Sequence, residues 1–175
     1  SSLHEENGKG IENIITNQMK ADNIDWSQTG FDEEIRDLTS LNFKNGKEAL
    51  EHFKEEFLPT YAEKLKEIEK KVNEWKRHKH HRQHGLKMRD VAEQLGISTV
   101  NLSNYVNTVE GMNFSAWLNS LRVEDAKRLM QAHPELSIYD IGYKVGHPIP
   151  DTFKKAFVTI TGQTPNEWRK ENIGK

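Results

Sequence analysis

The sequence contains no cysteine, and this absence excludes several classes of protein at once. Without Cys, the 175 residues cannot build a disulfide framework, a Cys-ligated zinc site or a cysteine nucleophile. No segment approaches the roughly 18 apolar residues that a membrane-spanning helix requires, and the chain does not open with a secretory signal. We therefore expect a protein of the reducing cytoplasm, without membrane contact within this chain. Because the chain begins with Ser1 and not with Met, a fragment of a longer protein is one interpretation of this sequence.

The sequence also lacks the short motifs of common catalytic sites. The patterns H-E-x-x-H, G-x-x-x-x-G-K and G-x-S-x-G do not occur, and no activated nucleophile can be placed. We expect no enzyme activity and no cofactor. The histidines at 78, 80, 81 and 84 have spacings that could ligate a metal on a helix, but no carboxylate lies among them and their neighbours are basic. We therefore favour no metal site.

Charge is distributed unevenly along the chain. Residues 1–75 contain 10 Lys or Arg and 17 Asp or Glu, whereas residues 76–175 contain 15 and 10. Six of the basic residues, together with four histidines, fall between Lys76 and Arg89. Such a run is typical of a solvated linker, and it could also lie along phosphates.

The first half of the chain divides into two predicted segments. Residues 1–45 are partly irregular, with a short helix expected near Ile11 to Met19. Residues 46–84 form a helical connector, because apolar residues recur every three or four positions. These are Leu50, Phe53, Phe57, Leu58, Tyr61, Leu65, Ile68, Val72 and Trp75. Pro59 could divide this segment into two helices, and its apolar stripe needs either the C-terminal domain or a second chain as partner.

An internal repeat organises the second half of the chain. Val91-Ala92-x-x-Leu95-Gly96 returns fifty residues later as Ile141-Gly142-x-x-Val145-Gly146. Leu102, Gly111 and Trp117 return fifty-one residues later as Phe153, Gly162 and Trp168. Each copy has the pattern of two helices joined by a glycine turn, which predicts two helix-turn-helix units.

In the first copy, the pattern separates a core face from a candidate DNA-reading face. Gly96 suits a turn with positive φ, and Ser98 can cap the second helix. Leu102, Tyr105 and Val106 are expected to point inward. The outward residues are short and polar or methyl-bearing, which suits a major groove, and Asn in particular can bridge adenine N6 and N7. They are Thr99, Val100, Ser103, Asn104 and Asn107; ordinary solvent exposure is the alternative interpretation.

A long helix is predicted between the two copies, from about Asn113 to Ala132, ending near Pro134. At 1.5 Å per residue it would span roughly 30 Å. Two recognition helices need a separation of about 34 Å to enter successive major grooves. Arg122 and Asp125 or Glu124 within this helix are expected to be structural, binding it to the flanking units through charge-assisted hydrogen bonds.

These motifs resemble the DNA-binding domain of the AraC-type (AraC/XylS) transcription regulators, over about Leu86 to Arg169. The resemblance is carried by Leu121-Arg122-x-x-x-Ala126-x-x-Leu129, Ser137-Ile138-x-x-Ile141, Val145-Gly146, Phe153-x-x-x-Phe157 and Thr161-Gly162-x-Thr164-Pro165-x-x-Trp168-Arg169. It implies two helix-turn-helices joined by a central helix, sequence-specific binding to double-stranded promoter DNA, and activation through contact with RNA polymerase.

The second copy departs from the family pattern. Gly-Phe followed by small polar residues is replaced by Gly146-His147-Pro148-Ile149-Pro150-Asp151, and Pro150 or Asp151 can still open the next helix. Its outward residues are predicted to be Asp151, Thr152, Lys154 and Lys155, with the lysines mainly holding the DNA backbone. We expect His147 to be a partly exposed imidazole that fills a slot; a pH switch is the alternative.

The sequence therefore predicts an all-α protein with segments 1–45, 46–84 and 85–175, the last being the double helix-turn-helix domain. The predicted function is a sequence-specific DNA-binding transcription regulator that places two recognition helices in successive major grooves. The alternative is a helical protein-interaction module whose second unit has weak or lost DNA binding. A homodimer through residues 46–84 is a further expected partnership.

Overall fold

The computed structural model describes residues 48, 52, 55 and 58–173. The helix expected near Ile11 to Met19, and most of residues 46–57, lie outside the described residues. The described part is all-α and contains no strand, which confirms the predicted fold class. Its elements are α4 (Leu58–Arg77), the 3₁₀ turn η2 (His80–Arg82), α5 (Met88–Leu95), α6 (Thr99–Tyr105), the π-helical turn η3 (Val106–Glu110), α7 (Phe114–Ala132), α8 (Ile138–Lys144), α9 (Pro150–Thr161) and α10 (Pro165–Asn172).

Side-chain caps set where several of these helices begin. Ser98 accepts a hydrogen bond from the Asn101 backbone N–H at 3.1 Å, as the sequence predicted, and so fixes the start of α6. Asn113, Ser137 and Thr164 cap α7, α8 and α10 in the same way. The turn between α5 and α6 uses Gly96 at φ +70°, a conformation that strains any residue with a Cβ.

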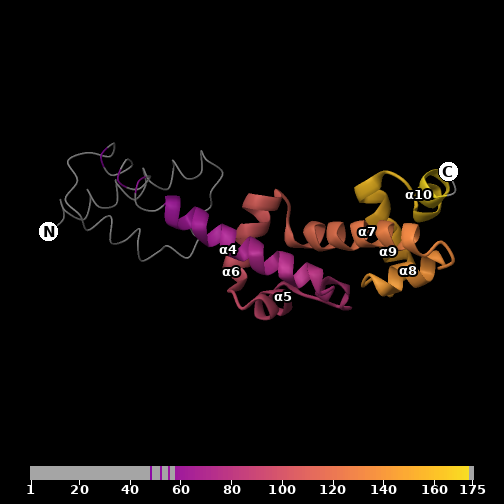
Figure 1. Ribbon diagram of the computed structural model, residues 1–175, viewed down its shortest axis with the longest axis horizontal. Helices are drawn as coiled ribbons and strands as arrows, with labels where there is room; N and C mark the ends of the chain where they lie inside the picture. The colour runs from indigo at the N-terminus through magenta and orange to yellow at the C-terminus, as the bar shows by residue number, and fades with distance from the viewer. Residues whose placement is uncertain (1–47, 49–51, 53–54, 56–57, 174–175) are drawn as a thin grey trace.

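The helices form two hydrophobic cores, and α7 contributes to both. Trp117 and Leu118, near its start, belong to the first core, whereas Val123, Ala126 and Met130 belong to the second. Figure 1 shows the consequence: α5 and α6 lie toward one end of α7, and α8, α9 and α10 lie toward the other. The predicted central helix is therefore confirmed, with its end at Ala132, two residues before Pro134.

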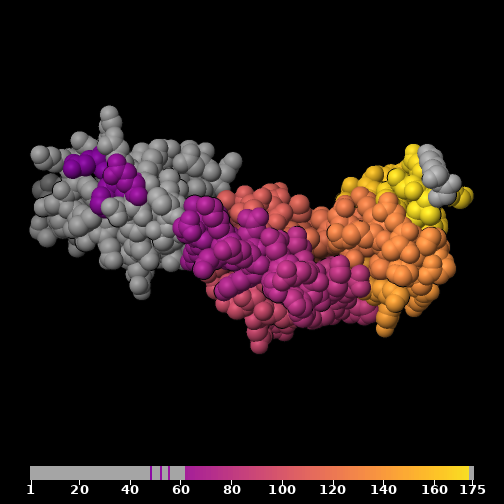
Figure 2. Space-filling model, viewed as in Figure 1, coloured from indigo at the N-terminus to yellow at the C-terminus, as the bar shows by residue number. Residues whose placement is uncertain are grey.

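Helix α4 completes the first core. Ile68, Val72 and Trp75 are all buried, and the Trp75 ring stacks on Trp117 with centroids 5.9 Å apart. The Trp75 indole N–H also donates to the side-chain oxygen of Gln94, at 2.7 Å. From Leu65 onward, the partner of the apolar stripe is thus the C-terminal part of the same chain, and Figure 2 shows α4 lying over the first unit.

The basic run after α4 is more than a solvated linker. Asp125 of α7 is 1% exposed and accepts hydrogen bonds from Arg82, at 2.6 and 2.9 Å, and from His81 Nε2, at 2.9 Å. Burial by itself would raise the pKa of Asp125, but the hydrogen bonds from Arg82 and His81 outweigh it and hold that pKa well below its usual range. This confirms a structural role for Asp125; Glu124 instead accepts from Lys127 of the same helix.

None of the helices in the described part of the chain combines the length and the apolar character needed to cross a bilayer.

Candidate nucleic-acid interface

The start of α6 presents part of the predicted reading face to solvent. Thr99 and Val100 are exposed, and Val100 retains 41% of its accessible surface. Ser103 is half-buried. Asn107 is exposed but lies in η3, beyond the end of α6, and its side-chain amide lies 3.4 Å from the Ser103 hydroxyl, to which it donates. Three exposed side chains of the predicted set therefore remain available on this unit: Thr99, Val100 and Asn107.

Asn104 is buried, contrary to the prediction from the sequence. It was expected to face outward and read adenine, but only 4% of its surface is exposed. Its side-chain oxygen accepts a hydrogen bond from the Thr108 hydroxyl, at 3.3 Å. A helical wheel with one inward face does not anticipate this, because α4, α5 and η3 all pack against α6. The change from α-helical to π-helical spacing after Tyr105 also alters which residues share a face.

All four predicted residues of the second unit are exposed. Asp151, Thr152, Lys154 and Lys155 lie in the first two turns of α9, which begins at Pro150 as predicted. Phe153, Ala156 and Phe157 on the opposite face are buried, and the two phenylalanines belong to the second core. The helix period thus separates a polar outer face from an apolar inner one.

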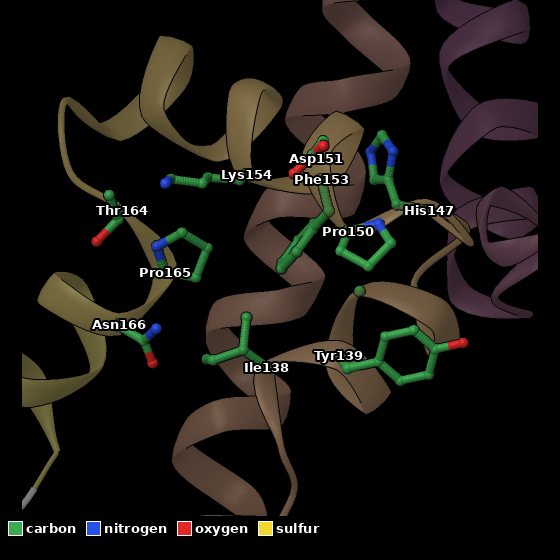
Figure 3. Close-up of a pocket in the computed structure, with 11 residues that line it drawn as sticks. Ile138, Tyr139, His147, Pro150, Asp151, Phe153, Lys154, Thr164, Pro165 and Asn166 are labelled. Carbon is green, nitrogen blue, oxygen red and sulfur yellow. The ribbon is translucent and has the colours of Figure 1, made fainter.

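A cavity of about 280 Å³ lies beside the start of α9 (Figure 3). Its lining combines residues from three helices: Tyr139 of α8, Pro150, Asp151 and Lys154 of α9, and Pro165 of α10. In Figure 3 the Lys154 side chain extends toward the start of α10. Asp151 and Lys154 therefore share one hollow, whereas Thr152 and Lys155 do not line it.

The turn that precedes α9 packs against Arg122 of the central helix. The Arg122 guanidinium is buried and donates to the backbone oxygens of His81, at 2.9 Å, and Gln83, at 2.6 Å. Burial lowers the pKa of Arg122 to about 10. A Cβ added to Gly146, which has φ +112°, would overlap this guanidinium. Arg122 therefore binds α7 to the segment before α5 and packs against Gly146 in the second turn, in agreement with the structural role predicted from the sequence.

His147, in the same turn, is buried and not partly exposed as the sequence suggested. Only 6% of its surface is exposed, and its ring lies 5.8 Å from that of Phe153. Burial, followed by the positive charge of Arg122 and the proximity of His84, lowers the pKa of His147 to about 4. The imidazole is therefore neutral near pH 7, where it fills space in the manner of an aromatic residue.

The histidine cluster does not converge on one point. Hydrogen bonds take these side chains to separate partners: His78 to the Glu74 carbonyl, His80 to Gln83, His81 to Asp125 and His84 to the Tyr143 carbonyl. Within residues 58–173 and the three isolated described positions, no group of three or more potential ligands is placed to hold a metal ion.

The two helix-turn-helix units match a known protein family. Residues 91–171 match the family described as a helix-turn-helix domain. This match covers 81 of the 175 residues, a little under half of the chain. The resemblance stated from the sequence over about Leu86 to Arg169 is thereby confirmed.

Two solved structures are similar to this chain. The C-terminal domain of AraT, a response regulator from Geobacillus stearothermophilus, is 28% identical, with a TM-score of 0.54 over 62% of this chain and 88% of that one. The DNA-binding domain of AdpA, a global transcriptional factor solved in complex with a target DNA, is 19% identical, with a TM-score of 0.51 over 59% and 90% of the two chains. At that identity the likeness to AdpA shows the fold alone.

A curated relative is the regulatory protein PocR of Salmonella typhimurium (strain LT2). It is 29% identical over 86 residues, which make up 49% of this chain. The match spans 28% of the length of PocR, so this chain covers less than a third of that relative.

One exposed residue at this surface was not among the predicted contacts. Ile149, immediately before α9, is 59% exposed. A signal for it was present in the sequence, namely a large aliphatic residue between two prolines where the family has small polar residues.

Proposed function

We propose that the chain is a sequence-specific DNA-binding transcription regulator that places two recognition helices, α6 with the following turn η3 and α9, in successive major grooves. The observation that carries this proposal is the duplicated unit itself. Each copy exposes the start of its second helix, and the two copies are attached to opposite ends of α7 (Figure 1). Recognition helices of helix-turn-helix proteins contact base edges through their N-terminal residues.

The length of α7 is compatible with this arrangement. Its 19 residues at about 1.5 Å each give about 28 Å, close to the one helical turn of about 34 Å that separates adjacent major grooves. Arg122 and Asp125 stiffen the attachment of α7 to the first unit, because both bind the segment that leads from α4 to α5. A rigid spacer supports simultaneous contact of both units with one duplex.

The exposed residues divide by chemistry into two roles. Thr99, Val100 and Asn107 have the hydroxyl, methyl and amide groups that read bases in the first unit. Lys154 and Lys155 supply positive charge for phosphates in the second unit, which adds affinity without sequence information. Asp151 is repelled by phosphates, so its place at the start of α9 favours contact with base edges. Asn104, being buried, is not among the proposed contacts.

Titration of selected duplexes against two variants tests this proposal. Asn107→Ala should lower selectivity among related duplexes by about 1–3 kcal/mol at one base position. Lys155→Ala should weaken binding to all duplexes alike and reduce the slope of log K against log salt by about one. If neither variant changes affinity, selectivity or salt dependence, the proposed DNA-facing surface is wrong.

A second candidate function is a helical protein-interaction module with weak or lost DNA binding in the second unit. The modest charge of residues 86–175, with 11 Lys or Arg against 10 Asp or Glu, favours it, as does the proline-altered turn before α9. A gel shift at low salt separates the two proposals. Complete absence of binding to random duplex DNA would favour the interaction module, because non-specific phosphate contacts are strongest under that condition.

Two further partnerships belong to this proposal. Contact with RNA polymerase follows from the role of activator that the resemblance implies. A homodimer through residues 46–84 would have to use the part of that segment before Leu65, because Ile68, Val72 and Trp75 are occupied in the first core.

A further inference from the structure

Ile149 stands exposed at the tip of the proposed second recognition helix. Among the large hydrophobic side chains that the structure describes, it retains the largest exposed fraction, 59%. Its backbone is extended, with φ −103° and ψ 116°, and its carbonyl accepts a hydrogen bond from Phe153 N–H at 3.1 Å. Pro148 and Pro150 flank it, and a following proline restricts a residue to extended conformations. The side chain is therefore presented from a stiff backbone.

The Ile149 side chain makes no contribution to helix capping. In the repeat register that aligns Leu102 with Phe153, Ile149 corresponds to Ser98, whose hydroxyl oxygen accepts from Asn101 N–H. α9 has no side-chain hydrogen bond at its cap. Aliphatic residues are among the poorest N-caps, and loss of a Ser cap costs about 1 kcal/mol. An aliphatic residue that forgoes the cap and remains in water gives the fold no compensating gain, which points to a contact outside the chain.

The neighbours of Ile149 favour a base edge over a phosphate or an apolar protein surface. Asp151, two residues later, carries a charge that phosphates repel. Lys154 and Lys155, one turn further along α9, are exposed and suit the phosphates on either side of a groove. In Figure 3, Pro150 and Asp151 lie at the edge of the hollow beside the start of α9.

We propose that Ile149 is a specificity-determining residue that contacts the 5-methyl group of a thymine in the major groove entered by α9. The proposal rests on the proposed DNA-binding function and adds to it a preferred base. Thymine is the only base that presents a methyl group in the major groove, and apolar side chains recognise it by contact. Reading in the second unit is thus assigned to an apolar group that precedes the helix, in addition to its polar outer face.

The test compares thymine with deoxyuridine, which pairs identically but lacks the methyl group. A duplex selected from a random pool by the full chain is synthesised with each thymine replaced in turn, and the dissociation constants are measured at one salt concentration. For the unchanged chain, one replacement should weaken binding about fourfold, as expected for one buried methyl group. Ile149→Ala should bind the thymine duplex about as weakly and lose no further affinity on that replacement.

Two control variants make the result specific. Ile149→Val keeps a branched apolar side chain and should retain a measurable thymine preference. Ile160→Ala removes another exposed apolar side chain, 37% exposed, near the far end of α9, and should leave the thymine preference unchanged. Helix content measured by circular dichroism should be the same for all variants, since each altered side chain is exposed.

The possible failures are distinguishable. If no thymine replacement weakens binding, or if Ile149→Ala retains the full penalty at the same thymine, the assignment to Ile149 is overturned while DNA binding stands. If the chain binds no duplex even at low salt, the proposed function falls, and this inference falls with it.

Discussion

His147 illustrates how a single buried side chain makes stability depend on pH. Its pKa in the folded protein, about 4, lies below the ordinary value of 6.5 because burial and the nearby Arg122 disfavour a second positive charge. Below about pH 6.5 the His147 imidazole binds a proton in the unfolded chain but stays neutral in the folded chain until the pH approaches 4. The stability associated with the neutral imidazole is therefore complete above that pH, and it is lost as the pH falls toward 4.

We predict that replacing His147 with Phe removes most of this pH dependence. The folded form of the unchanged chain should lose on the order of 3 kcal/mol between about pH 6.5 and about pH 4, relative to the variant. Urea unfolding at several pH values measures the difference. Between about pH 7 and about pH 8, above the titration window, the two stability curves should run parallel. Equal losses in both proteins on acidification would show that proton uptake does not occur at His147.

Predictions for single residues succeeded where the role of the residue depends on its immediate neighbours in the chain. The roles of Gly96 and Ser98 are local, since one needs a positive φ and the other accepts a hydrogen bond three residues away, and both were predicted. The burial of Asn104 and His147 depends on residues far away in the sequence or on a change of helix type, and neither was predicted.

Among the elements, the two helix-turn-helix units pack their first helix against their second with different residues. The first pairs Ala92 of α5 with Leu102 of α6, and the repeat register makes Gly142 of α8 and Phe153 of α9 their counterparts. A Cβ on Gly142 would lie 2.8 Å from Phe153 Cδ2. A larger side chain on the second helix thus requires a smaller one on the first, and the summed volume is nearly conserved.

We predict that Gly142→Ala destabilises the chain by about 1–3 kcal/mol, because the Phe153 ring must shift. Helix propensity alone predicts the opposite sign, a gain of about 1 kcal/mol. Thermal and urea unfolding decide between the two. In a double-mutant cycle, Phe153→Leu should relieve the clash, so that Gly142→Ala costs less in that background. A stabilised single variant, or strictly additive effects, would contradict the contact.

At the scale of the whole molecule, α4 is part of the C-terminal fold and at the same time leads from residues 1–57. Ile68, Val72 and Trp75 fill the first core, and the segment after α4 binds α7 through His81 and Arg82. His84 reaches the second unit through the Tyr143 carbonyl, at 2.8 Å. A displacement of α4 would therefore be transmitted to both helix-turn-helix units. This supports the proposed role of residues 46–84 as a connector.

We predict that the full chain sediments as a dimer and that a chain beginning at Leu58 sediments as a monomer. The shorter chain keeps Ile68, Val72 and Trp75, so its first core stays complete; a chain beginning near Gly85 would lose all three. Identical monomeric profiles for the two chains would remove the proposal of a homodimer through residues 46–84. Circular dichroism of the shorter chain serves as the control for folding.

The sequence by itself determined the all-α class, the repeat, the glycine turn at Gly96 and the central helix, because each rests on local periodicity or on one residue's backbone preference. Tertiary structure decided which of the outward-facing residues reach solvent. Asn104 is covered and Ile149 is exposed, although neither result follows from helical periodicity. Exposure depends on the packing of α4 against α6, on the π-helical turn η3 that follows α6, and on the packing of the turn before α9 against Arg122. The contacts of α4 and Arg122 join residues that are far apart in the chain, and η3 is a change of helix type that periodicity does not anticipate.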